Sequence, residues 1–111
     1  MSFEQEKEGL VKIIEGMRSR GWQPTQVFDG EEYIALEPGQ DAASIVEECS
    51  STDDSTLIFN GISPSRRGSL YLVWGNSPSE LVADNSIGHG FDVDLDETLR
   101  DVFPGWPNCE D

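Results

Sequence analysis

The sequence predicts an α+β fold, in which a single domain holds an antiparallel sheet of about four strands, in two hairpins, with helices packed on it. Apolar residues recur at helical spacing over residues 3–20 and 42–49. A pair of short β-prone runs follows each of these segments, which is typical of hairpins. The length of 111 residues is that of one ordinary domain, so we expect 1–111 to fold as a unit with 104–111 as a loosely ordered tail.

The first helix is expected over residues 3–20, where charged residues separate the members of an apolar stripe. Gly9 and Gly16 lie seven positions apart near one face of this helix, where they lower helix propensity and allow another element to approach closely. Gly21 then follows two arginines, as is typical of a helix C-terminus. The apolar stripe consists of Phe3, Leu10, Ile13, Ile14 and Met17.

A first hairpin is expected over residues 25–36, because Asp29-Gly30 separates two β-prone runs and has residue types that tolerate a type I′ turn. Asp41 can then cap a second helix that ends near residue 50. Its apolar residues follow at i, i+3, i+4 and i+7 and are Ala42, Ile45, Val46 and Cys49. Because Cys49 belongs to this apolar face, we expect a buried free thiol there.

A second hairpin is expected from the β-prone runs at 56–60 and 69–74. Short connections favour the two hairpins as neighbours in one sheet. After the second hairpin, Ser77, Pro78 and Glu80 are residue types that favour the first turn of a helix. We therefore expect a short helix through residues 81–83, namely Leu81, Val82 and Ala83.

The stretch FDVDLDETL at residues 91–99 is expected to be a brief extended segment, 91–93, that leads into a final helix. Asp94 suits the N-cap, while Asp96 and Glu97 suit the first turn, where negative charge meets the positive helix end. An apolar stripe follows and Pro104-Gly105 ends the helix. The stripe consists of Leu95, Leu99, Val102 and Phe103.

Residues 94–99, DLDETL, are also similar to a motif of the haloacid dehalogenase-like phosphatases. That resemblance implies Asp94 as nucleophile, Asp96 as general acid and base, and Mg²⁺ as the metal. In that family the motif ends the first strand of a parallel sheet, and later segments supply a lysine and further metal ligands. Here twelve residues without a lysine follow Leu99. The start of a helix accounts for the residue types at 94–99 better than a phosphatase motif does. We therefore predict no catalytic residue, metal site or cofactor.

Charge is the most distinctive global property, since 22 acidic against 7 basic residues give a formal net charge of −15. Such a charge opposes direct contact with nucleic-acid phosphates or an anionic membrane and favours a basic partner surface. High acidity also serves solubility or adaptation to salt. The chain has neither a secretory signal pattern nor eighteen consecutive apolar residues, so a cytoplasmic protein is expected.

These observations predict a small acidic, non-enzymatic protein-interaction domain, of the adaptor, inhibitor or immunity type, which binds a basic partner protein. Trp106, between two prolines, is the expected aromatic anchor, unless it seals the core under the last helix. One alternative is a nucleic-acid mimic that inhibits a DNA- or RNA-binding protein, and another is an enzyme of unrecognised type. The candidate partner-binding residues are Asp92, Asp94, Asp96, Glu97 and Trp106.

Overall fold

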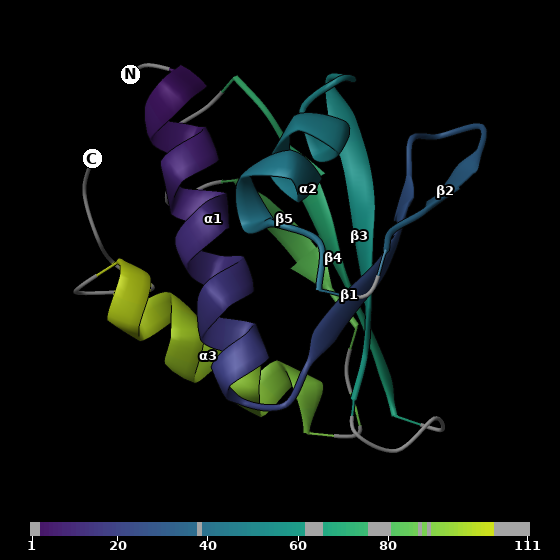
Figure 1. Ribbon diagram of the computed structural model, residues 1–111. Coiled ribbons are helices and arrows are strands. Elements are labelled where there is room, and N and C mark those ends of the chain that lie inside the picture. Colours follow the sequence, from purple (N-terminus) through teal and green to yellow (C-terminus); the bar gives the residue numbers. More distant parts are fainter. Residues whose placement is uncertain are drawn as a thin grey trace.

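In the part of the chain described by the computed structural model, three helices lie on one face of a five-stranded antiparallel sheet (Figure 1). The described residues are 3–37, 39–61, 66–75, 81–86, 88 and 90–103. The strand order is β2-β1-β3-β4-β5. In chain order the elements are α1 (Phe3–Ser19), β1 (Gln23–Phe28), β2 (Tyr33–Ala35), α2 (Ala42–Cys49), β3 (Asp54–Asn60), β4 (Arg67–Val73), β5 (Val82–Asn85) and α3 (Phe91–Val102).

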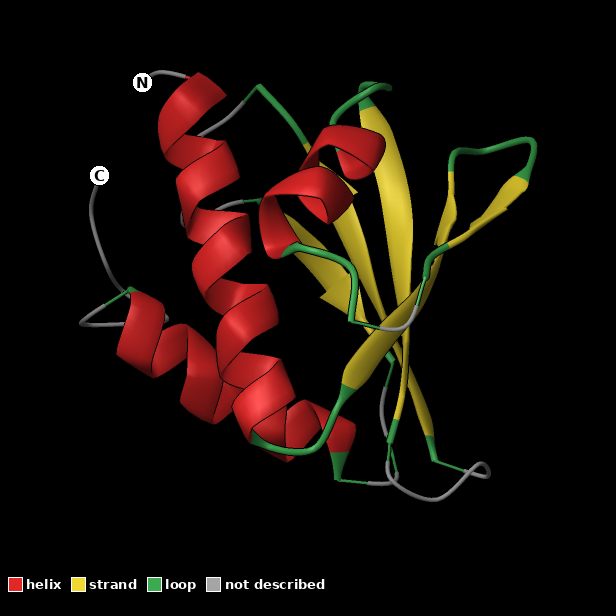
Figure 2. Cartoon of the chain, viewed as in Figure 1, coloured by secondary structure: helices red, strands yellow, loops and turns green. Residues whose placement is uncertain are grey.

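The predicted α+β class is confirmed, and so are both early helices and both hairpins. β1 pairs with β2 and β3 pairs with β4, while β1 and β3 join the two hairpins as neighbours. Strands β3 and β4 begin two residues earlier than the sequence predicted, because their ladder continues from Asp54 opposite Val73 to Asn60 opposite Arg67. Figure 2 shows the helices together on one side of this sheet and no described helix over the other side.

The predicted short helix through Leu81, Val82 and Ala83 is wrong, because Val82–Asn85 forms the edge strand β5. This strand pairs antiparallel with β4, so it uses backbone groups of β4 that would otherwise have no partner strand. Leu81 is completely buried at the start of the strand. Tertiary pairing and burial therefore override the local helix signals. The residues that carried those signals, Ser77–Glu80, and the predicted tail at 104–111 lie outside the described residues.

The turn between β1 and β2 is longer than the two-residue turn that Asp29-Gly30 suggested. The Asp29 carboxylate accepts the backbone N–H groups of Glu31 and Glu32 at 2.9 and 2.8 Å. Gly30 adopts a φ of 105°, which favours glycine. The N–H donors, that of Glu32 foremost, hold the pKa of Asp29 below its usual value. The turn is thus organised by the Asp29 side chain.

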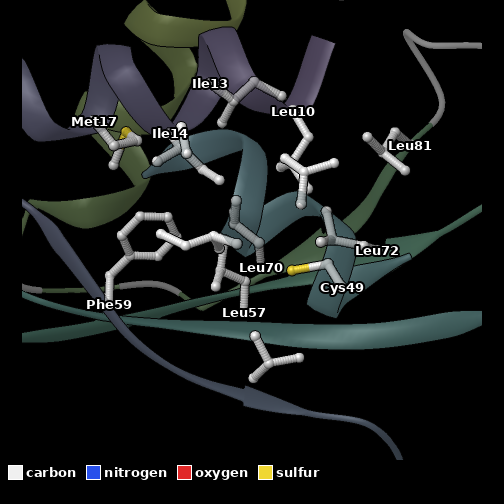
Figure 3. Packing of buried hydrophobic residues seen from close by; sticks show 14 of the residues in the cluster. Leu10, Ile13, Ile14, Met17, Cys49, Leu57, Phe59, Leu70, Leu72 and Leu81 are labelled. Carbon is white, nitrogen blue, oxygen red and sulfur yellow. The ribbon is translucent and has the colours of Figure 1, made fainter. Parts of the chain in front are cut away.

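The core fills the space between the helices and the sheet (Figure 3). Cys49 of α2 is fully buried there as the predicted free thiol. Burial, followed by the nearby charge of Glu48, raises its pKa to about 12. The Cys49 carbonyl accepts hydrogen bonds from Ser55 and from the indole of Trp74, which ties the end of α2 to the sheet.

Helices α1 and α3 approach each other closely at the two glycines of α1, as the sequence predicted. A Cβ atom at Gly16 would lie 2.7 Å from the methyl group of Thr98, and one at Gly9 would lie 3.2 Å from the ring of Phe103. The hydroxyl of Thr98 donates to the Asp94 carbonyl at 2.8 Å, so its polar atom is satisfied inside the interface. Among the described residues, no helix has the length and apolar character needed to span a membrane.

Candidate functional site

Helix α3 carries the predicted site, and its start is fixed by Phe91. The Phe91 ring is fully buried and packs edge-on against Trp22, with ring centres 4.9 Å apart. It also lies tilted against Phe59, with ring centres 5.5 Å apart. Gly90 precedes it with a φ of 80° and no side-chain cap. The helix therefore begins three residues before Asp94, so the predicted N-cap at Asp94 and the extended segment at 91–93 are both wrong. The first turn holds Asp92 and Asp94, and not Asp96 and Glu97 as predicted. Burial of Phe91 decides the boundary, and a glycine supplies the left-handed entry.

Asp94 is turned towards the body of the protein. Its carboxylate accepts the indole N–H of Trp22 at 2.8 Å, and Trp22 is only 1% exposed. The guanidinium of Arg66 also contacts this indole and lies 4.8 Å from the centre of the Trp22 ring. Asp94 is half-buried, satisfies a buried donor and anchors α3, and its predicted contact with a partner stays a prediction.

The phosphatase-like hexapeptide lies inside α3, and the sheet beside it is antiparallel. The arrangement that the resemblance implies, with both aspartates at the end of a parallel strand, is therefore absent from the described residues. Two positions along a helix correspond to a turn of roughly 200° about its axis, so Asp94 and Asp96 point to different sides. Asp96 pairs instead with Arg100 at 2.8 Å on the exposed side.

The outer side of α3 brings three of the predicted residues together, because Asp92, Asp96 and Glu97 line one open hollow of about 600 Å³. Val93 and Arg100 are the other described residues of its lining. Val93, which is 59% exposed amid these carboxylates, was not among the predicted residues. The signal was present in the helical pattern, since Val93 is an apolar residue on the polar side of the stripe formed by Leu95 and Leu99.

Arginines pair with much of the acidic charge around this hollow. Arg20 of α1 lies 2.8 Å from Asp101 and 3.8 Å from Glu97, which links α1 to the last turns of α3. Asp92 accepts the backbone N–H of Gly88 at 3.3 Å and has no ion pair with any described residue. Exposed ion pairs of this kind contribute about 0–1 kcal/mol each, so these arginines are exchangeable for cations of another molecule.

The remaining predicted site residue, Trp106, lies outside the described residues, so its role as an aromatic anchor stays a prediction. Within the described ranges, no group of three or more His, Cys, Asp or Glu side chains is arranged to hold a metal ion. No protein-family model, no curated protein and no solved structure matches the chain.

Proposed function

We propose that the protein is a small acidic interaction domain that binds a basic surface of another protein through the outer side of α3. The observation that carries this proposal is the hollow in which exposed Val93 is surrounded by Asp92, Asp96 and Glu97. A large apolar side chain that is 59% exposed supplies contact area, and the carboxylates around it supply orientation and charge complementarity.

The charge of the whole molecule supports the same proposal. A formal net charge of −15 attracts basic surfaces over a distance of about one Debye length, roughly 8 Å at physiological salt. A partner lysine or arginine that enters the hollow replaces Arg100 beside Asp96 or meets Asp92 directly. Contact with Val93 then adds a component of binding that salt does not screen.

The experiment is affinity capture from the native lysate with matched baits, at low and high salt and with and without nuclease, and DNA is added as a competitor only where nuclease is absent. The test bait carries Asp92→Asn, Asp96→Asn and Glu97→Gln. The control bait carries Glu31→Gln and Glu32→Gln in the β1–β2 turn and Glu37→Gln just after β2. Both baits lose three negative charges, so they differ only in where the charge is removed. A third bait, Val93→Thr, keeps the charge and removes only apolar contact.

We expect a near-stoichiometric partner that the wild-type and control baits retain and that the test bait and Val93→Thr lose. Retention by all four baits would overturn the assignment to α3, and equal loss from the test and control baits would reduce the effect to net charge. Displacement of the partner by DNA would identify it as a nucleic-acid-binding protein, and the protein would then act as a nucleic-acid mimic at this surface.

A further inference from the structure

The face of the sheet opposite the helices carries a row of side chains that the strand register aligns. Phe28 is paired with Tyr33 and with Thr56, Thr56 with Tyr71, and Tyr71 with Asp84. Neighbouring residues on these strands, such as Val27, Leu57, Leu70 and Leu72, are buried in the core, so the row points the other way. Figure 2 shows no described helix over this face.

Three aromatic rings form most of this row. The Phe28 and Tyr33 rings lie 4.6 Å apart, and Tyr33 and Tyr71 are 61% and 38% exposed. The Tyr71 hydroxyl donates to the Asp54 carboxylate at 2.5 Å, which fixes the direction of its ring across the sheet. The exposed Tyr71 ring is thus held in place on the interior strand β4, while Tyr33 stands on the edge strand β2 beside Phe28, and together they form an aromatic contact surface.

Tyr71 and Thr56 separate two hollows on this face. The larger, of about 370 Å³, is also lined by Ser69, Asp84 and Ser86, and the smaller, of about 170 Å³, contains Asp54 beside Phe28. Each hollow therefore holds one carboxylate beside an aromatic ring. No lysine or arginine among the described residues lines either hollow.

We infer that this sheet face binds an extended, arginine-bearing segment of another protein laid across Tyr71. Carboxylates and ring faces both attract cations, whereas the net charge of −15 repels phosphate groups. A guanidinium suits both features better than an ammonium, because its plane stacks on a ring while its paired N–H groups meet a carboxylate. Asp84 forms no ion pair with a described residue and is the carboxylate that this arginine meets.

The geometry of the strands sets the spacing of the basic residues. Asp54 on β3 is paired with Val73 of β4, and Asp84 on β5 is paired with Tyr71, so the two carboxylates are offset by two residues along β4. In regular strands this offset and the two strand spacings place them roughly 12 Å apart. Side chains four residues apart on one side of an extended segment are about 13 Å apart. An arginine at every second or every fourth position therefore reaches both hollows.

This site lies on the opposite side of the molecule from the hollow of α3, so it does not depend on the function proposed there. The test uses a peptide in which arginine and threonine alternate, with citrulline and lysine versions as matched controls. Binding to the full chain is measured by fluorescence anisotropy, and backbone amide shifts in NMR spectra locate it. The protein variants are Tyr71→Leu, Tyr71→Phe, Asp84→Asn and, as a control of equal charge, Glu15→Gln, an exposed residue of α1 that lines none of these hollows.

We expect the arginine peptide to shift the amides of Thr56, Ser69 and Tyr71, in addition to any shifts at the hollow of α3. Tyr71→Leu and Asp84→Asn each weaken binding about threefold, the size expected for one exposed cation–π contact or ion pair. Tyr71→Phe keeps the ring and binds like wild type, as does Glu15→Gln. Circular dichroism confirms that each variant is folded.

Three results would overturn the inference. Equal binding of the citrulline peptide would exclude recognition of positive charge, and equal binding of the lysine peptide would exclude a guanidinium site. Amide shifts that leave Thr56, Ser69 and Tyr71 in place, or that spread evenly over the whole surface, would place the peptide elsewhere. Loss of peptide binding in Tyr71→Leu with the partner of α3 still captured would separate this site from the function proposed for α3.

Discussion

Replacement of Gly68 by alanine is expected to destabilise the protein strongly, because the Phe91 ring occupies the space that a side chain needs. A Cβ atom on Gly68 would lie 2.2 Å from Cγ and Cδ1 of Phe91 and 2.6 Å from Cε1. Carbon atoms in contact prefer about 3.5–4.0 Å, so the ring has to retreat by roughly 1.5 Å. Trp22 and Phe59 hold the ring from other directions, so it has little room to move.

Overpacking of a buried site typically costs about 1–3 kcal/mol, and the rigid surroundings of Phe91 place Gly68→Ala near 3 kcal/mol. Alanine also restricts the unfolded chain more than glycine does, which stabilises the folded state by about 0.4–1 kcal/mol. The net loss in the free energy of unfolding is therefore about 2 kcal/mol. At roughly 4–8 °C per kcal/mol for a domain of this size, the midpoint of thermal unfolding falls by about 10 °C.

The assay is urea unfolding followed by far-UV circular dichroism, in a double-mutant cycle with Phe91→Leu. The smaller Leu side chain leaves room for the new methyl group, so Gly68→Ala should cost less than about 1 kcal/mol in that background, a coupling of more than about 1 kcal/mol. Ser69→Ala, on the opposite face of the same strand, serves as the control and stays within about 0.5 kcal/mol of wild type. Strictly additive effects of the two core substitutions would refute the contact.

Three further predictions concern Asp94, Gly16 and Cys49. Asp94→Ala removes the acceptor of the buried Trp22 indole and costs about 1–3 kcal/mol in urea unfolding, whereas Asp94→Asn keeps an acceptor and costs less. Gly16→Ala places a methyl group against Thr98 and costs about 1–3 kcal/mol, most of which Thr98→Ser restores. Cys49, with a pKa of about 12 in the folded state and 9.0 as the reference value, keeps its proton on folding. Stability therefore falls as the pH rises above 9, by at most about 1.4 kcal/mol per pH unit, and this slope disappears in Cys49→Ala.

Each of these effects has a specific contrary result. If Asp94→Ala unfolded at the same urea concentration as Asp96→Asn, the indole bond would not anchor α3. If Gly16→Ala lowered the free energy of unfolding equally with and without Thr98→Ser, the methyl group of Thr98 would not be the atom that the new side chain meets. Identical pH slopes above pH 9 in wild type and Cys49→Ala would mean that the thiol ionises as readily folded as unfolded.

The spacing of apolar residues along the chain was sufficient to predict the helices and hairpins in which those same residues are buried in the core. The stripe of Leu10, Ile13 and Met17 is buried as expected, and Gly9 and Gly16 do face a second helix. The edge strand β5 escaped prediction because its pairing with β4 is a long-range interaction that outweighs the helix signals before it.

The candidate site was predicted in part, since the charges of α3 were recognised but the direction of each side chain was not. Placing the helix start at Asp94 concealed that Asp94 faces Trp22, 72 positions away in sequence. The boundary depends on the packing of Phe91 against Trp22 and Gly68, which one sequence does not reveal. The same holds for the row across Tyr71, because cross-strand neighbours are set by register and not by spacing along the chain.

The most direct measurement of docking at α3 is carboxylate footprinting of the protein alone and with its captured partner. Carbodiimide-coupled labelling followed by mass spectrometry reports the accessibility of each Asp and Glu side chain. The proposed function predicts that Asp92, Asp96 and Glu97 lose label in the complex while Glu31 and Glu32 on the far hairpin keep theirs. Unchanged labelling along α3, with protection only elsewhere, would contradict it.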